Sequence, residues 1–233
     1  MSAARAIVTG SSSGIGAAIT RRLLADGWWV LGLDRAPAAL MHERFTAMTV
    51  DLCDDTQLGV CITTLVAQGA PDALVHAAGV LRTAPLGSLQ PEDGALMWRL
   101  HVQTATRLAD ALLPAMRAAG RGRLLLIGSR VSQGMPGRSQ YAASKAALVA
   151  LARSWASEVV ADGVTVNLIS PAATDTPMLA DPHRAGSAPR LPPIGRLIQP
   201  GEVAALAAFL LSPEAAAITG QDIAVCGGAS LPR

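Results

Sequence analysis

The chain has 233 residues, of which 51% are hydrophobic and 15% are charged, and its net charge is +2. This composition excludes an intrinsically disordered protein, and the length favours a single domain, residues 1–233, with one core. Because the sequence holds no run of like charges and its three cysteines form no CxxC pair, we expect no nucleic-acid partner, no disulfide framework and no metal site.

Short apolar runs predict about seven β-strands, separated by stretches with a helical pattern. In chain order the strands are expected at residues 4–8, 28–33, 45–50, 73–76, 123–127, 164–169 and 222–225. The helices are expected at 17–26, 55–68, 92–119, 139–162 and 202–211, the third of them interrupted by Pro114 near its end. No run reaches the roughly 18 apolar residues that span a bilayer, and no signal peptide opens the chain. We therefore expect a cytoplasmic protein without a membrane partner.

Strands that alternate with helices pair in parallel through right-handed crossovers. The pattern therefore predicts an α/β fold, a doubly wound parallel sheet of about seven strands with helices on both faces. Ligands of such sheets bind beyond the carboxyl ends of the strands. The segment 171–200 contains seven prolines, and we expect a loop at about 172–198 to cover the substrate.

The first strand is followed by a glycine-rich loop with the pattern G-x-x-x-G-x-G. Between a strand and a helix, such a loop lets backbone N–H groups approach a pyrophosphate at the helix N-terminus. We therefore assign cofactor binding to Gly10, Ser12, Ser13, Gly14, Ile15 and Gly16. A turn that merely needs positive φ is one alternative at this point, and the glycine loop of a methyltransferase is another.

Two aspartates follow the second and third predicted strands. Asp34 lies 18 residues after Gly16, where a carboxylate can accept hydrogen bonds from the adenosine ribose and repel a 2′-phosphate. This favours NAD over NADP, although Arg35 beside it is able to pair with a phosphate. Asp51 is expected either to bind the adenine amine or to cap the following helix.

The single tyrosine and the single lysine of the chain, Tyr141 and Lys145, are four residues apart on one predicted helix. An ammonium on the same helical face favours the phenolate, so Lys145 is expected to lower the pKa of Tyr141. Ser129 follows the preceding strand and is placed to orient a substrate oxygen. Together the three side chains predict an acid–base site. A half-buried tyrosine beside a surface lysine is the structural alternative.

With these residues the sequence resembles the short-chain dehydrogenase/reductase family over nearly its whole length. The motifs that carry the resemblance are Thr9 through Gly16, Asp34, Asp51-Leu52, Ala77-Ala78-Gly79, Ser129, Tyr141 with Lys145, Asn167, and Pro171 through Met178. The resemblance implies a single-domain Rossmann-like fold and hydride transfer between C4 of a nicotinamide and a carbonyl or secondary alcohol carbon. NAD is the expected cofactor, with NADP as the alternative.

The resemblance also implies roles for individual residues. Tyr141 is the general acid or base, Ser129 orients the substrate oxygen, and Lys145 also binds the nicotinamide ribose. Further cofactor contacts are implied for Leu52, Ala77, Gly79, Thr174 and Thr176. A homo-oligomer, either a dimer or a tetramer, is implied through the two long helices.

The sequence departs from the family pattern at four positions, His76, His101, Ala172 and Cys226. His101 stands where the family has its fourth catalytic residue, an asparagine. An imidazole both donates and accepts protons, so we expect His101 to join the proton path and to add a pH dependence. A histidine that only fills space is the alternative. The departure also leaves open a catalytically impaired NAD-binding protein with a binding or regulatory role.

Overall fold

The structure is a computed structural model, and it describes residues 3–38, 40–181, 184 and 190–231. Its centre is a parallel sheet of seven strands in the order β3-β2-β1-β4-β5-β6-β7. The strands are β1 (Arg5–Thr9), β2 (Trp29–Asp34), β3 (Phe45–Thr49), β4 (Ala73–His76), β5 (Gly122–Ile127), β6 (Val164–Pro171) and β7 (Asp222–Val225). The doubly wound α/β fold predicted from the sequence is confirmed. The strand order reverses between β1 and β4, which is where such sheets bind their ligands.

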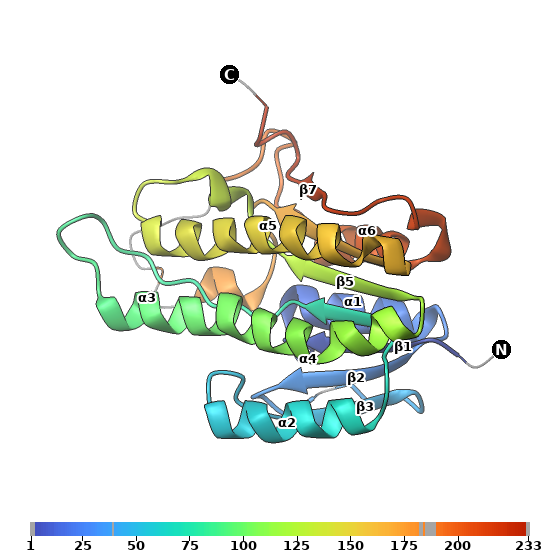
Figure 1. Cartoon of the computed structure of the whole chain (residues 1–233). Coiled ribbons are helices and arrows are strands. Elements are labelled where there is room, and N and C mark those ends of the chain that lie inside the picture. The colour runs from blue at the N-terminus through green and yellow to red at the C-terminus, as the bar shows by residue number, and fades with distance from the viewer. Residues whose placement is uncertain (1–2, 39, 182–183, 185–189, 232–233) are drawn as a thin grey trace.

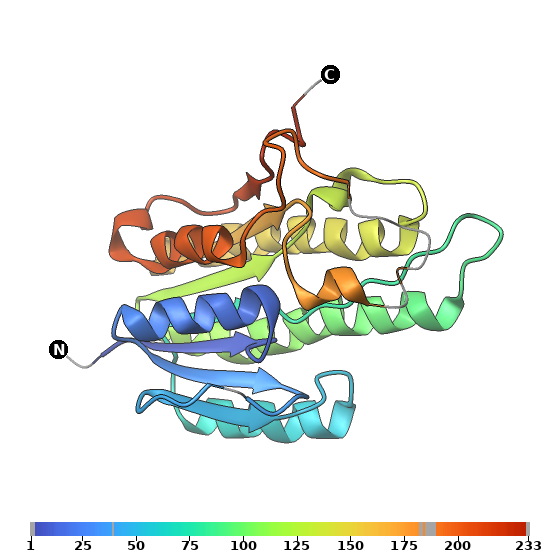
Figure 2. The same cartoon turned by 180° about the vertical axis from the view of Figure 1, so that it is seen from behind.

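Helices cover both faces of the sheet, as Figures 1 and 2 show from opposite sides. They are α1 (Gly14–Ala25), α2 (Asp55–Ala67), α3 (Pro91–Trp98), α4 (Thr104–Ala118), α5 (Ser139–Val159) and α6 (Pro200–Leu211). Apolar side chains of α2, α4 and α5 form one buried cluster with one face of the sheet. Those of α1 and α6 form a second cluster with the opposite face. Burial on both sides explains why the central strands read as continuous apolar runs.

The helix expected at 92–119 differs from the prediction in two ways. It begins as α3 and passes through a π-helical turn, Arg99–Gln103, before it continues as α4. It is also not interrupted at Pro114, which lies inside α4, so the predicted interruption is wrong. A proline removes one hydrogen bond, and the seven side chains that α4 buries against the sheet outweigh that loss.

The expected substrate loop, 172–198, is described at residues 172–181, 184 and 190–198, and its remaining residues lie outside the described part. It contains a short 3₁₀ helix, Pro177–Ala180, and a parallel bridge between Thr174 and Ile198. In β6, Asn167 donates to the Ile218 carbonyl oxygen and accepts from the Gln221 amide. These bonds fix the chain between α6 and β7 beside the sheet.

Candidate active site

A cavity of about 1160 Å³ lies at the carboxyl ends of the central strands. Its walls include the glycine loop, the turns after β2, β3, β4 and β5, the first turns of α5 and the loop after β6. Fifteen of the sixteen cofactor-binding residues assigned from the sequence line it, the exception being Ser12. Residues from distant segments of the chain therefore meet at one edge of the sheet.

The glycine loop is packed too closely for larger residues. Gly10 has a φ of +68°, and a Cβ there would lie 2.9 Å from the backbone of Ala78. A Cβ on Gly16 would collide with the carbonyl oxygen of Gly10. Ser13 precedes α1 and makes no capping bond with its side chain, so the first N–H groups of the helix face the cavity without a side-chain cap. This cradle of glycine backbone and helix N-terminus fits a dinucleotide pyrophosphate.

Asp34 is held by backbone donors at the end of β2. Its Oδ2 accepts from the Ser12 amide at 3.0 Å, and its Oδ1 accepts from the Ala36 amide at 3.0 Å. The Ser12 hydroxyl donates to the Ala36 carbonyl oxygen, and Ser12 itself does not line the cavity. Asp34 and its neighbour Arg35 both line it, at the end where an adenosine would lie.

Of the two roles expected for Asp51, helix capping is wrong. Asp54 caps α2, because its Oδ1 accepts from the amides of Thr56 and Gln57 at 2.9 Å. Asp51 accepts instead from the Cys53 amide at 2.8 Å. Asp51 and Leu52 both line the cavity near its adenosine end, as the cofactor assignment requires.

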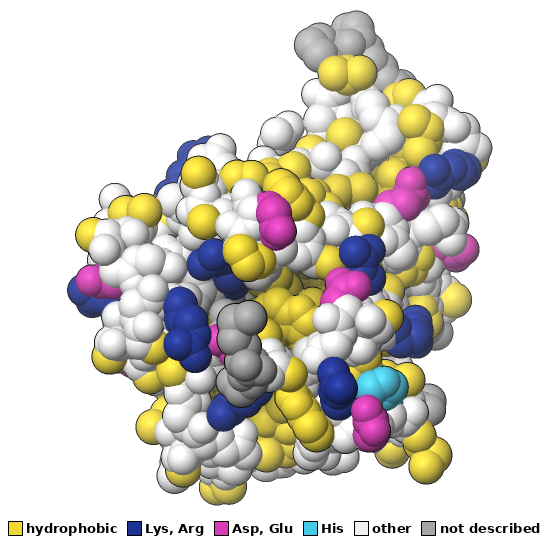
Figure 3. Space-filling model, turned by 90° about the vertical axis from the view of Figure 1, so that its right-hand side faces the viewer, with side chains coloured by type: hydrophobic (Ala, Val, Ile, Leu, Met, Phe, Trp, Pro, Cys, Tyr) yellow, Lys and Arg dark blue, Asp and Glu magenta, His cyan; other side chains and the backbone are white. Residues whose placement is uncertain are grey.

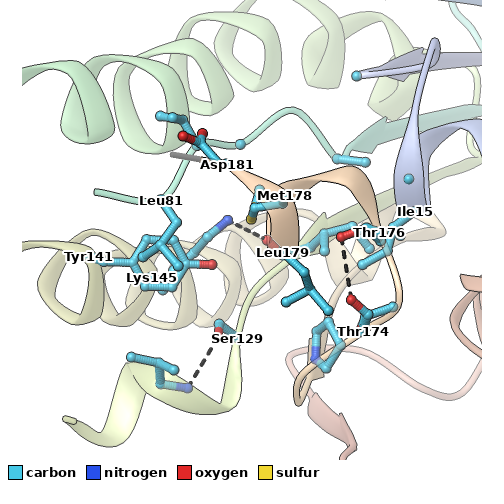
Figure 4. A pocket seen from close by; sticks show the side chains of 18 of the residues that line it. Ile15, Leu81, Ser129, Tyr141, Lys145, Thr174, Thr176, Met178, Leu179 and Asp181 are labelled. Atoms are coloured by element: carbon cyan, nitrogen blue, oxygen red, sulfur yellow. Dashed lines mark hydrogen bonds between the residues drawn. The ribbon is translucent and has the colours of Figure 1, made fainter. Parts of the chain in front are cut away.

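Ser129, Tyr141 and Lys145 meet in the middle of the cavity. Figure 4 shows the two side chains from α5 and the one after β5 pointing into the same space, with Met178 and Leu179 across from them. All three are buried, and Lys145 Nζ lies 5.8 Å from the centre of the Tyr141 ring. Lys145 donates to the Ile127 carbonyl oxygen at 2.8 Å, and Ser129 Oγ accepts from the Val131 amide at 3.2 Å. Hydrogen bonds to the backbone thus hold Lys145 and Ser129 in place.

The protonation of the group follows from its burial. Burial raises the pKa of Tyr141 above its ordinary value of 10, while the Ser129 side chain and then the charges of Arg138 and Arg184 lower it in part. Burial also lowers the pKa of Lys145 from 10.5 to about 7. Tyr141 is therefore a protonated phenol at neutral pH.

The cavity does not include His101, which is fully buried behind Tyr141. The Ser144 hydroxyl donates to the Tyr141 carbonyl oxygen at 2.8 Å, so it accepts from His101 Nδ1 at 2.9 Å. His101 Nε2 accepts the Val80 amide proton at 3.0 Å. Both ring nitrogens are thus engaged within the protein, which does not support the proton path expected for this residue.

His76 has a structural partner in the π-helical turn. Thr9 Oγ1 accepts from the amides of Ala77 and Ala78, so its proton goes to His76 Nδ1 at 3.0 Å. His76 Nε2 therefore donates to the Leu100 carbonyl oxygen at 3.1 Å. This bond supplies a partner to the π-helical turn, and it joins the end of β4 to the helix that carries His101.

Two arginines on the cavity wall were not among the residues predicted for the site. Arg138 immediately precedes α5, and Arg184 belongs to the loop after β6. Both act electrostatically on Tyr141. Because arginine is the common cation of this sequence, the sequence favours a solvated loop charge for Arg138 over a contact with an acidic substrate, and it does not single out Arg184.

Within the described part of the chain, no helix combines the length and apolar character that a membrane span needs. The same residues include no group of three or more His, Cys, Asp or Glu side chains arranged to hold a metal ion.

Comparison with known proteins places this geometry in a family. A family model described as enoyl-(acyl carrier protein) reductase matches residues 10–230. The 3-oxoacyl-(acyl-carrier-protein) reductases of Escherichia coli and Vibrio cholerae are 35% and 33% identical to the chain over 234 residues, and each match covers 96% of both proteins.

Solved structures agree with the sequence matches. A 3-ketoacyl-(acyl-carrier-protein) reductase from Brucella melitensis complexed with NADH superposes with a TM-score of 0.88 at 26% identity, over 98% of each chain. An actinorhodin polyketide ketoreductase with NADPH gives a TM-score of 0.89 at 28% identity, over 99% of this chain and 98% of that one. The chain belongs to the short-chain dehydrogenase/reductase family of nicotinamide-dependent oxidoreductases.

Proposed function

We propose that the chain reduces a ketone to a secondary alcohol, with Ser129, Tyr141 and Lys145 as its catalytic residues. The observation that carries this proposal is the convergence of two hydroxyl groups and an ammonium in one cavity, beside a glycine loop built for a dinucleotide. Two hydroxyl groups that face one point suit a single carbonyl oxygen. The glycine loop by itself would indicate only a dinucleotide site, and the two hydroxyl groups point to reduction of a carbonyl.

A nicotinamide dinucleotide would supply the hydride at C4 of its ring when bound. The backbone of Gly10, Gly14 and Ile15 would hold its pyrophosphate at the start of α1. Asp34 and Asp51 would hold the adenosine, and Thr174 and Thr176 would lie at the nicotinamide end. Asp34 favours NAD over NADP because its carboxylate would repel a 2′-phosphate.

Tyr141 would donate its proton to the substrate oxygen as the carbonyl is reduced, since burial raises its pKa and keeps the phenol protonated. The Ser129 hydroxyl, which accepts from the Val131 amide, has its own proton available to orient that oxygen. The Lys145 ammonium would stabilise the phenolate that remains. A pKa of about 7 for Lys145 means that this stabilisation weakens as the pH rises through neutrality.

The names of the relatives point to two reactions, reduction of a 3-oxoacyl carbonyl and reduction of an enoyl double bond. We favour the carbonyl, because an oxygen is the group that Ser129 and Tyr141 can bind together. A homo-oligomer, dimer or tetramer, and a cytoplasmic location belong to the same proposal. Light scattering after size-exclusion chromatography tests the assembly.

Steady-state turnover of matched substrates tests the proposed function. We expect reduction of acetoacetyl thioesters and simple 3-oxo esters, and no reduction of crotonyl thioesters. The variant Tyr141→Phe should lower kcat by about 10²- to 10⁴-fold with an unchanged dissociation constant for the dinucleotide. Cofactor binding without turnover of any ketone would instead favour the alternative, a catalytically impaired binding protein.

A further inference from the structure

The cavity continues past the catalytic residues towards the edge of the sheet that β7 forms. Ala229 and Leu231, which follow β7, line it together with Leu191 from the segment before α6. Because β2 and β3 form the opposite end of the sheet, these three residues lie away from the adenosine end. The volume of about 1160 Å³ also exceeds the roughly 300–1,000 Å³ of a pocket for one ligand. A dinucleotide along the glycine loop would thus leave this end of the cavity for the substrate.

Two chain segments, residues 191–195 and 226–231, form this end, and we call them the apolar rim. The Ile194 amide donates to the Gly227 carbonyl oxygen at 3.1 Å, which ties the two segments together. Gly227 has a φ of +55°, and a Cβ there would lie 2.7 Å from Ile194 Cγ1. Figures 1 and 2 both show the C-terminal segment, in red, beside the orange segment that precedes α6. The apolar rim is therefore a folded part of the cavity wall.

The apolar rim presents hydrocarbon to water at the mouth of the cavity. Leu191 is 55% exposed and Leu231 is 69% exposed, although both line the cavity. Neither segment of the rim contains a charged residue. In Figure 3 the described side chains at the top of the molecule, where the chain ends, are hydrophobic or uncharged, and basic and acidic side chains are interspersed below them. A ligand that covers this hydrocarbon gains free energy by removing it from water.

Apolar side chains also surround the reacting centre. Leu81, Val131 and Met178 line the cavity and belong to the apolar cluster that includes Tyr141. Among the described lining residues, Arg190 is the charged residue nearest to the apolar rim in the sequence, and its side chain is exposed. Its guanidinium can therefore stay in water while its neighbours contact hydrocarbon. Apolar contacts are thus available at the reacting centre and at the rim.

We propose that the apolar rim binds a hydrocarbon chain of the substrate, so that the ketone reduced by this protein carries an alkyl chain directed from Tyr141 towards Leu191 and Leu231. This inference rests on the proposed ketone reduction and names the substrate class of the same site. Each methylene group that such a chain buries should tighten binding by up to about fourfold. Leu191 and Leu231 then determine specificity, because they distinguish long ketones from short ones without contacting the carbonyl.

Binding of ketones beside an oxidised dinucleotide tests the apolar rim without turnover, because that dinucleotide carries no hydride to transfer. The probe is NAD, or NADP if NADP binds more tightly. In ligand-observed NMR titrations of the full chain, 2-octanone should bind at least about tenfold more tightly than 2-butanone. Leu231→Ala and Leu191→Ala should each weaken binding of 2-octanone by about three- to tenfold and leave that of 2-butanone within about twofold.

Leu86→Ala is the matched control. It removes the same side chain at a position that is 85% exposed and is not among the described residues lining the cavity, so it should change neither affinity. Equal affinity of the wild type for the two ketones, or a preference for 2-octanone that both rim variants keep, overturns the proposal.

A second copy of the chain is the other occupant that such a surface admits. If a second copy covered the apolar rim, Leu231→Ala would lower the mass measured by light scattering and would keep the preference for 2-octanone. That outcome overturns the proposal. If the rim binds substrate, the mass should stay the same while the preference falls.

Kinetics with the reduced dinucleotide separate this inference from the proposed function. We expect kcat/KM at least about tenfold higher for 2-octanone than for 2-butanone, and Leu231→Ala should raise KM for 2-octanone with kcat within about twofold. Equal kcat/KM for both ketones, unaffected by the rim variants, overturns the role of the rim and leaves the reductase intact. Turnover of neither ketone and of no 3-oxo ester, with binding of 2-octanone that depends on Leu231, retains the rim and rejects the reductase. Thermal unfolding of each variant identifies any loss caused by misfolding.

Discussion

The ring of His101 packs edge to face against the ring of Tyr141, with their centroids 5.6 Å apart and their planes at 87°. The same imidazole donates to Ser144, whose hydroxyl donates to the Tyr141 carbonyl oxygen. On its other side it accepts the Val80 amide proton. One neutral tautomer satisfies all of these bonds. His101 therefore contacts the ring of Tyr141 directly and its backbone through Ser144, and both contacts help to position the tyrosine.

We predict that His101 adds no titration to catalysis. Burial and the nearby charges of Lys145 and His76 lower the pKa of His101 well below 6.5, so it stays neutral across the working range of the enzyme. His101→Asn should reduce kcat by no more than about tenfold and destabilise the fold by about 1–3 kcal/mol, because Val80 and Ser144 lose a partner. The pH–rate profiles of the two proteins should have the same shape.

Ser144→Ala is the matched control, because it removes the contact with Tyr141 and keeps the imidazole. A transition between pH 5 and 8 that is present in the wild type and in Ser144→Ala, and absent in His101→Asn, would contradict the positioning role. It would restore the proton path that the sequence suggested.

We predict an acid-dependent loss of stability caused by His76. Burial, followed by the charge of Lys145, lowers its pKa in the folded state from 6.5 to about 3. Below pH 6.5 His76 therefore binds a proton in the unfolded chain but not in the folded chain. The free energy of unfolding falls as the pH drops from 6.5 towards 3. The loss from this one residue is of order 3–5 kcal/mol by pH 3.

Urea denaturation at several pH values measures this effect. His76→Asn should show a shallower decline of the free energy of unfolding with falling pH. His42→Asn replaces an exposed histidine and should keep the slope of the wild type. Equal slopes in all three proteins would show that His76 is protonated as easily in the folded chain as in the unfolded one.

Much of the architecture is encoded locally. The strands Ala73–His76 and Asp222–Val225 have the boundaries expected from their apolar runs, because glycine, proline or polar residues flank each run closely. The pairing of Tyr141 with Lys145 was equally visible, since four residues are one helical turn. These features depend on spacing alone.

The features that the sequence did not predict depend on contacts between distant segments. In the π-helical turn, the Leu100 carbonyl oxygen accepts a hydrogen bond from His76, which is 24 residues away in the sequence. The closed ring of bonds around His101 likewise involves Val80 and Ser144 from other elements. Arg184 is buried on the same cavity wall as Tyr141, from which it is 43 residues away in the sequence. No local pattern contains such information.

We predict that Gly16 is required for both folding and cofactor binding. An alanine there would push its Cβ into the Gly10 carbonyl group, and that backbone cannot move away because Gly10 itself abuts Ala78. Gly16→Ala should cost at least about 1–3 kcal/mol of stability and weaken dinucleotide binding. Chemical denaturation and fluorescence titration measure the two effects.

The control is Gly201→Ala in the first turn of α6, where a Cβ meets no atom within 4 Å among the described residues. This change should be neutral or stabilise the helix by about 0.5–1 kcal/mol. If Gly16→Ala changed stability no more than Gly201→Ala does, the glycine loop would not be as closely packed as the structure shows.

We predict that Asp34 sets the cofactor preference. The wild type should bind NADH more tightly than NADPH, because the carboxylate lies at the adenosine end of the cavity, where a 2′-phosphate would meet its negative charge. Asp34→Ser should bring the two dissociation constants to within about tenfold of each other or reverse their order, with Arg35 free to pair with the phosphate.

Asp110→Ser is the control, because it removes a charge from the exposed side of α4 and should keep the preference. Asp34 also accepts from the amides of Ser12 and Ala36, so its loss should cost stability whichever cofactor is present. A wild type that binds NADPH more tightly would show that Arg35 outweighs the carboxylate.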